Sequence, residues 1–215
     1  MHYTSVLFDL DGTLLDTLGD LTAAMNRTLT RHGLPERTRQ QMRAALGNGA
    51  RRLMELSVPA GTDGTLFETL LAEYNADYAA HCRIETAPYP GVDALLQQLH
   101  AQGRKLAIVS NKPDEAVRAL RTEFFADTVP IAVGETAAIR RKPTPDMLLA
   151  AMEKLGADPD KTVFVGDSEV DIATARAAGL PCISVLWGFR DRDLLEQAGA
   201  QQFAADAGEL AKLLD

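Results

Sequence analysis

Short apolar runs alternate with helical patterns along this chain, and that alternation restricts its fold more than any other feature. Six runs, several of them rich in β-branched residues, are bounded by turn-forming residues, which is typical of short strands buried on both faces. The predicted strands cover residues 5–9, 105–110, 129–133, 162–166, 182–186 and 202–205. A proline in the third run indicates an edge strand or a strand start.

Helical patterns lie between these strands. The predicted helices cover residues 92–101, 113–122, 145–155 and 171–178, and Gly179 directly after the last of them is a favourable helix end. Strands that alternate with helices form a parallel sheet with helices on both faces. The sequence therefore predicts an α/β fold whose core is a Rossmann-like parallel sheet.

Residues 16–85 interrupt this alternation. Helices are predicted over residues 17–31, 37–46 and 63–82, and no good strand pattern occurs among them. The length of 215 residues suits one domain with an insertion. We therefore expect an α/β core made of residues 1–15 and 86–215, with a helical domain of residues 16–85 inserted after the first strand.

The balance of charges disfavours two classes of partner. The chain has 22 Lys and Arg against 30 Asp and Glu, a net charge of −8, whereas nucleic acids and anionic membranes are bound by basic surfaces. The longest stretch without a charged residue, 177–189, is well short of the ~20 apolar residues that span a bilayer. The N-terminus carries no secretion signal, and two cysteines, Cys82 and Cys182, make no disulfide framework. These features predict a cytoplasmic protein.

Polar residues gather where the predicted strands end. In an open parallel sheet, ligands bind outside the carboxyl ends of the strands, so residues that follow different strands meet at one edge. In chain order these residues are Asp9, Asp11, Ser110, Asn111, Lys142, Asp167 and Asp171. We expect them to form one site.

The carboxylates in this set need a cation. Asp9 and Asp11 are two residues apart, so in an extended segment they face the same way, and Asp167 adds a third charge. Close carboxylates repel one another. A hard divalent cation such as Mg²⁺, which prefers oxygen ligands, would offset that repulsion.

The same edge offers groups that can bind a phosphate. Ser110, Asn111 and Lys142 supply hydrogen bonds and positive charge, and Gly12 allows backbone N–H groups to approach phosphate oxygens. A carboxylate nucleophile, a metal and an anion site together indicate phosphoryl transfer through an aspartyl-phosphate. One aspartate would attack phosphorus and another would move the protons, and the spacing alone leaves open which does which.

These motifs resemble those of the haloacid dehalogenase superfamily of phosphatases, in the same order along the chain. The first motif is matched by residues 9–16 (Asp-Leu-Asp-Gly-Thr-Leu-Leu-Asp), the second by Ser110, the third by Lys142 and the fourth by residues 166–171 (Gly-Asp-Ser-Glu-Val-Asp). The match covers essentially the whole chain, and residues 16–85 lie where the family has its cap domain. The resemblance therefore implies the fold of that superfamily with a helical cap.

The resemblance also implies roles for single residues. Asp9 would be the nucleophile and Asp11 the acid and base. Mg²⁺ would be held by the Asp9 side chain, the Asp11 backbone carbonyl and Asp167. Asp171 and Thr13 would support the site. The groups implied to bind the phosphoryl group are Ser110, Asn111 and Lys142.

Details of the motifs narrow the subgroup. The aspartate at position 11 favours phosphate esters over the substrates of dehalogenases and phosphonoacetaldehyde hydrolases. β-Phosphoglucomutases typically carry a histidine where this chain has Leu21. The segment Gly47-Asn48-Gly49 is similar to a cap loop of phosphoglycolate phosphatases, and with Arg51 or Arg52 it would meet the carboxylate of the substrate.

The sequence thus predicts a Mg²⁺-dependent phosphatase of a small phosphorylated metabolite, most like phosphoglycolate phosphatase and acting as a monomer or homodimer. A sugar-phosphate mutase or a pyrophosphatase on the same scaffold, and a non-catalytic binding protein, are the alternatives. Four further residues are given structural interpretations. Lys112, Arg140 and Arg141 are interpreted as surface charges, and Trp187 is interpreted as a packing residue.

Overall fold

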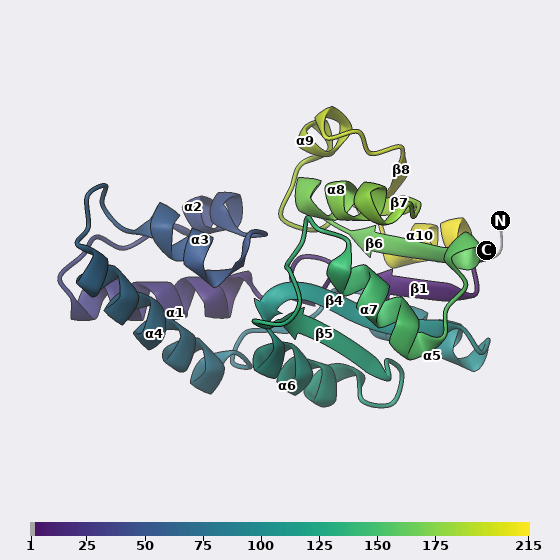
Figure 1. The fold of residues 1–215 in the computed structure, drawn as a ribbon, viewed down its shortest axis with the longest axis horizontal. Coiled ribbons are helices and arrows are strands. Elements are labelled where there is room, and N and C mark those ends of the chain that lie inside the picture. The colour runs from purple at the N-terminus through teal and green to yellow at the C-terminus, as the bar shows by residue number, and fades with distance from the viewer. Residues whose placement is uncertain (1–2) are drawn as a thin grey trace. The chain divides into compact units, whose positions relative to one another are not determined.

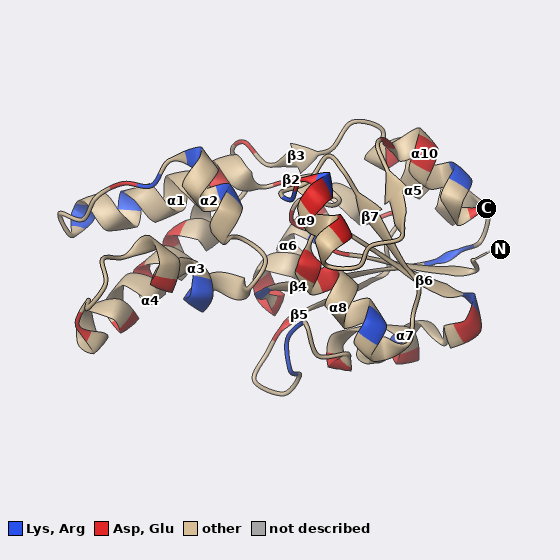
Figure 2. Ribbon diagram, turned by 90° about the horizontal axis from the view of Figure 1, so that it is seen from above, with Lys and Arg blue, Asp and Glu red and all other residues tan. Residues whose placement is uncertain are grey.

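The computed structural model describes residues 3–215 (Figure 1). The chain folds into two compact units, one made of the residues up to Leu15 together with Pro88–Asp215, and the other of Asp16–Ala87. Basic residues are scattered over many elements of both units (Figure 2). No helix in the described part of the chain combines the length and the apolar character that crossing a bilayer requires.

A six-stranded sheet forms the centre of the larger unit. Its strands are β1 (Ser5–Phe8), β4 (Lys105–Pro113), β5 (Ile131–Glu135), β6 (Thr162–Gly166), β7 (Cys182–Val185) and β8 (Gln202–Ala204). They lie in the order β5-β4-β1-β6-β7-β8, and all neighbouring pairs are parallel. The predicted α/β fold is confirmed. β5 begins only after Pro130, since proline cannot donate a hydrogen bond to the sheet.

Helices cover both faces of this sheet. In chain order they are α5 (Val92–Ala101), α6 (Asp114–Phe125), α7 (Asp146–Leu155), a 3₁₀ turn (Pro159–Lys161), α8 (Glu169–Ala178), α9 (Arg192–Gln197) and α10 (Ala207–Leu214). Figures 1 and 2 show α7 and α8 on one face and α5 and α10 on the other. The sequence patterns predict neither α9 nor α10, because each is too short to show a clear helical period.

Side chains that alternate along the strands fill the core on both faces. Leu7 and Phe164 pack with Leu148 of α7 and Ala175 of α8. Phe8, the next residue of β1, is also fully buried. Each buried Leu or Phe stabilises the fold by roughly 1.5–3 kcal/mol. The sheet is therefore a rigid base for the loops that leave its carboxyl edge.

Four helices make up the smaller unit: α1 (Leu18–Arg31), α2 (Arg39–Ala45), α3 (Gly49–Ser57) and α4 (Gly64–His81). The predictions of α1, α2 and α4 are confirmed, and α3 begins within the segment Gly47-Asn48-Gly49. The buried carboxylate of Asp77 ties α4 to α1. It accepts hydrogen bonds from Arg27 at 2.6 and 2.9 Å and from Arg31 at 3.1 Å.

The chain passes between the units through two short strands. β2 (Leu15–Asp16) and β3 (Ala87–Pro88) pair with one another as a two-stranded sheet. The buried Asp20 of α1 accepts hydrogen bonds from the backbone N–H groups of residues 84–86 at 2.9 to 3.1 Å. The returning segment is thereby fixed to the first helix of the smaller unit.

Candidate active site

The strand order of the sheet reverses at β1, which is where an open parallel sheet offers a binding crevice. β4 and β5 lie on one side of β1, and β6, β7 and β8 lie on the other. Asp9 directly follows β1 and Asp167 directly follows β6, its neighbour in the sheet. Both carboxylates therefore leave the carboxyl edge at this reversal point.

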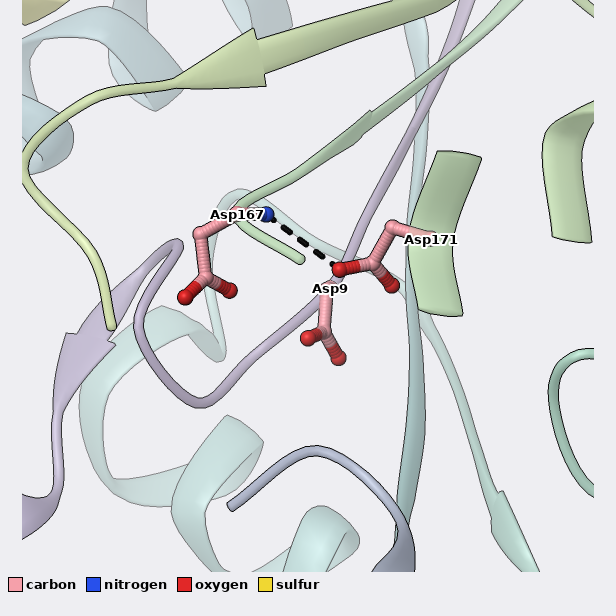
Figure 3. A group of neighbouring side chains, drawn as sticks. All are labelled: Asp9, Asp167 and Asp171. Atoms are coloured by element: carbon pink, nitrogen blue, oxygen red, sulfur yellow. Dashed lines mark hydrogen bonds between the residues drawn. The ribbon is translucent and has the colours of Figure 1, made fainter. Parts of the chain in front are cut away.

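Three buried carboxylates meet there (Figure 3). Carboxylate oxygens of Asp9, Asp167 and Asp171 all lie within 4.8 Å of one another. Asp171 comes from the first turn of α8, where its Oδ2 accepts a hydrogen bond from Ser168 Oγ at 2.6 Å. The same oxygen accepts the backbone N–H of Asp167 at 3.2 Å, the dashed line in Figure 3. The start of α8 thus fixes Asp171 beside the two strand-end aspartates.

A buried lysine offsets part of this charge. Lys142 Nζ lies 2.8 Å from Asp9 Oδ1 and 2.7 Å from Asp171 Oδ1, and its side chain is 2% exposed. Burial alone would lower the pKa of Lys142, but the carboxylates of Asp171 and Asp9 raise the pKa above its ordinary value. Lys142 is therefore held in its protonated form.

Lys142 does not offset all three carboxylates. Burial raises the pKa of Asp167 to about 7, and the negative charge of Asp171 raises it further. The hydrogen bonds that the Asp167 oxygens accept from Phe189 and Thr13 act in the opposite direction. Burial also holds the pKa of Asp9 well above its ordinary value, although Lys142 acts in the opposite direction. The cluster therefore favours the addition of positive charge.

The donor set of this cluster suits a hard divalent cation. Asp9 Oδ1 is paired with Lys142 but accepts no aligned hydrogen bond. Gly12 and Gly188 bring backbone directly against Asp167, since a Cβ at either position would clash with that side chain. Mg²⁺ in proteins is typically held by one or two carboxylates, with water and substrate oxygens completing the shell. The carboxylates of Asp9 and Asp167 fit that requirement.

Asp11 lies on the same loop and has a buried partner. Lys112 Nζ is 3.1 Å from Asp11 Oδ1, and the two side chains are 4% and 19% exposed respectively. Gly12 adopts a φ of 84°, which only glycine reaches without strain, and so turns the chain directly after Asp11. Thr13 Oγ1 then donates a hydrogen bond to Asp167 Oδ1 at 3.1 Å. This turn places Asp9 and Asp11 on the loop that contacts Asp167.

The three residues predicted to bind phosphate are also buried at this edge. The side-chain amide of Asn111 donates to the Lys142 carbonyl at 3.0 Å, and Asn111 Oδ1 accepts the Lys142 N–H at 2.8 Å. Ser110 Oγ accepts the backbone N–H of Lys112 at 3.3 Å. Asn111 therefore fixes the backbone that carries Lys142.

Residues 6–185 match the profile of the family described as haloacid dehalogenase-like hydrolase. The chain belongs to this family. The match spans both the first strand and the strand-end residues of β6.

Several relatives of this hydrolase are phosphatases. A phosphoglycolate phosphatase of Xanthomonas campestris pv. campestris is 36% identical over 187 residues, which cover 86% of this chain and 84% of that protein. An N-acetylmuramic acid 6-phosphate phosphatase of Pseudomonas aeruginosa is 32% identical over 217 residues, covering 100% of this chain and 96% of that protein. The chain also resembles a crystal structure from Lactobacillus delbrueckii subsp. bulgaricus that is assigned as a phosphoglycolate phosphatase. The two share 36% sequence identity and superpose with a TM-score of 0.94, and the match covers 100% of this chain and 99% of the other chain. The predicted family, subgroup and enzyme class, a phosphoric monoester hydrolase, are confirmed.

The four residues of the predicted substrate loop lie in the helical unit of this hydrolase. Gly47 and Gly49 adopt positive φ angles of 109° and 77°, and Asn48 between them is the N-cap residue of α3. Arg51 on α3 donates hydrogen bonds to Glu68 at 2.8 and 2.9 Å. The guanidinium group of Arg51 is therefore engaged within its own unit.

The interpretation of Lys112 as a surface charge is wrong, because its side chain is buried against Asp11. Arg140 and Arg141 are surface charges as predicted, with side chains 76% and 41% exposed. One signal could have revealed the burial of Lys112: it stands two residues after Ser110, so in a strand its side chain lies on the same face.

The sequence reasoning also missed the loop that follows β7, residues 187–190. Its Phe189 N–H donates to Asp167 Oδ2 at 2.7 Å. The loop follows the predicted strand 182–186, so its place at the carboxyl end of a parallel strand is a signal for a site residue.

Proposed function

We propose that this phosphatase hydrolyses a small phosphorylated metabolite, with 2-phosphoglycolate as its first candidate, in a Mg²⁺-dependent reaction through an aspartyl-phosphate. The observation that carries the proposal is the buried cluster at the reversal point of the sheet. There Asp9, the first aspartate of the Asp-x-Asp motif, contacts Lys142 at 2.8 Å, and Asp167 lies beside it. This arrangement combines a carboxylate nucleophile with cationic groups that bind a phosphoryl group.

The reaction runs in two steps. The carboxylate of Asp9 attacks phosphorus, the bond from phosphorus to the leaving oxygen breaks, and Asp11, which enters this step as the carboxylic acid, gives that oxygen its proton. Water then attacks the aspartyl-phosphate and passes a proton to the Asp11 carboxylate. Inorganic phosphate leaves, and both aspartates return to their starting forms.

Other residues of the chain bind and orient. Ser110 and Lys142 bind the phosphoryl oxygens, Asn111 fixes the backbone of Lys142, and Lys112 holds Asp11 through their 3.1 Å ion pair. The ligands proposed for the metal are the Asp9 side chain, the Asp11 carbonyl and Asp167, with support from Asp171 and Thr13. Bound Mg²⁺ would offset the negative charge that the cluster and the phosphoryl group share.

We assign substrate recognition to the helical unit, acting as a cap that excludes water from the site. The glycine-rich loop at residues 47–49, together with Arg51, is proposed to meet the carboxylate of phosphoglycolate; Arg51 would then have to leave Glu68. N-Acetylmuramic acid 6-phosphate is the second candidate, because a full-length relative is named for it and it also carries a carboxylate. We place the enzyme in the cytoplasm as a monomer or homodimer that binds neither nucleic acid nor membrane.

A panel of phosphorylated compounds tests the substrate. Release of inorganic phosphate is measured with 2-phosphoglycolate, N-acetylmuramic acid 6-phosphate, pyrophosphate and β-glucose 1-phosphate, each with Mg²⁺ and with excess chelator, and glucose 6-phosphate is also measured in the reaction with β-glucose 1-phosphate. The highest kcat/KM is expected for 2-phosphoglycolate, and chelator should abolish turnover. Preference for pyrophosphate, or conversion of β-glucose 1-phosphate to glucose 6-phosphate, would refute the substrate and favour the alternatives on the same scaffold.

A single substitution tests the nucleophile. Asp9→Asn is expected to lower kcat at least ~10³-fold with the fold intact, since the amide cannot form the aspartyl-phosphate. Asp160→Asn, an exposed aspartate on the 3₁₀ turn, is the control and should keep full activity. Near-normal hydrolysis by Asp9→Asn would refute the assignment.

A further inference from the structure

Most of the 187–190 loop, which lies between β7 and α9, is buried. Gly188, Phe189 and Arg190 are buried, and the Arg190 side chain is only 8% exposed. Burying an arginine is costly unless its charge is paired. The loop of residues 187–190 is therefore held in one conformation by specific contacts.

Its backbone lies directly against Asp167. Phe189 N–H donates to Asp167 Oδ2 at 2.7 Å, while Thr13 Oγ1 donates to Oδ1 at 3.1 Å, so both carboxylate oxygens are oriented. A Cβ at Gly188 would clash with the Asp167 side chain and with the Gly12 carbonyl. This position therefore requires glycine for a close approach rather than for a left-handed φ.

Two side chains fix the ends of the loop. Trp187 Nε1 donates to the Thr13 carbonyl at 3.0 Å, which ties the loop to the turn after β1. Arg190 makes two hydrogen bonds to Glu169 in the first turn of α8, at 2.8 and 3.2 Å. The loop is thus tied both to the turn after β1, which contacts Asp167, and to the first turn of α8, which follows Asp167 in the chain.

We propose that the 187–190 loop orients Asp167 for metal binding, and that Trp187 and Arg190 act as positioning residues through Phe189 N–H. The proposal rests on the metal role of Asp167 in the proposed function. Carboxylates that bind metals are commonly held by hydrogen bonds from surrounding groups, and loss of such a group typically weakens metal binding ~10–100-fold. The expected signature is therefore weaker metal binding in a chain that still folds.

Two variants with a matched control test this. Trp187→Phe keeps an aromatic ring but removes the donor to Thr13, and Glu169→Ala removes a hydrogen-bond partner of Arg190. Glu196→Ala breaks the Arg192–Glu196 pair on α9, and the Glu169 and Glu196 side chains are similarly exposed, at 44% and 50%. Binding of Mn²⁺ to the substrate-free protein is measured by the electron paramagnetic resonance signal of the free ion, with Mg²⁺ as competitor.

Both test variants should bind Mn²⁺ about tenfold more weakly than wild type. Trp187→Phe should unfold in chelator at a temperature close to that of Glu196→Ala, whereas Glu169→Ala should unfold at a lower temperature because it removes a carboxylate that pairs with the buried Arg190. A merely structural role would lower the unfolding temperature without changing the affinity. Test variants that bind Mn²⁺ as tightly as wild type, or an equal loss in Glu196→Ala, would overturn the proposal. If wild type binds no metal, both the role of the loop and the metal role of Asp167 are refuted. If wild type binds metal but does not hydrolyse 2-phosphoglycolate, only the proposed substrate is refuted.

Discussion

Replacing Lys142 by methionine would leave Asp9 and Asp171 buried without the cation that lies within 2.8 Å of both. Methionine has a similar length, so the change removes charge more than volume. Removal of one partner of a buried ion pair costs ~3–5 kcal/mol, because the remaining charge is desolvated and unpaired. With an m-value of ~2 kcal/mol/M in urea, that loss would lower the unfolding midpoint by about 2 M.

The effect is measured in chelator by urea unfolding followed by circular dichroism. The double variant Lys142→Met/Asp171→Asn should be more stable than Lys142→Met, since it removes one of the uncompensated charges, and a double-mutant cycle gives the coupling energy. Lys154→Met, at an exposed position of α7, is the control and should leave the midpoint unchanged. A loss below about 1 kcal/mol for Lys142→Met, or a further loss in the double variant, would refute the assigned charge balance.

Three further outcomes are expected. Lys112→Met removes the ion pair that holds Asp11 and should lower kcat about tenfold in the phosphate-release assay. It should also lower the unfolding temperature, though less than Lys142→Met does, because Lys112 pairs with one of these carboxylates rather than two; an unchanged kcat would show that the ion pair is dispensable. Asp77→Ala leaves two arginines of α1 without their shared partner and should lower the free energy of unfolding by roughly 1.5–3 kcal/mol, measured by urea unfolding. The pKa of Asp167 rises from 3.8 to about 7 on folding, so its stabilising effect is complete below pH 4 and is lost as the pH rises through 7. In chelator, the stability of Asp167→Asn relative to wild type should therefore increase as the pH rises from about 4 to 7, and a constant difference over that range would contradict the pKa shift.

The sequence was sufficient for the framework because its strands are continuous apolar runs. β1 and β6 are buried over their whole length, so their residues are apolar on both faces and stand out from the surrounding sequence. Parallel strands bring their carboxyl ends together. Asp9 and Asp167 could therefore be placed at one site although they are far apart in the chain.

Contacts between side chains from distant segments could not be predicted in this way. Lys112 precedes a proline and has the local pattern of a surface charge, and its pairing with Asp11 joins two distant segments. The buried Arg190 likewise pairs with a residue from a distant segment, Glu169. Arg51 was predicted to face a substrate, and no local pattern indicates its pairing with Glu68 on the next helix. Each of these pairs depends on tertiary packing rather than on period or composition.

The pairing of β2 with β3 bears on how such enzymes can diversify. Because the helical segment leaves and returns through neighbouring strands, its two ends are close together, and exchange of Asp16–Ala87 for another segment with close ends need not stretch the sheet. Asp9 and Asp167 stand on core strand ends and would keep their places after such an exchange. Selection can therefore change the inserted segment and the reaction centre at different rates, and a chimera that keeps the core but carries a relative's insertion is a direct route to new substrate ranges.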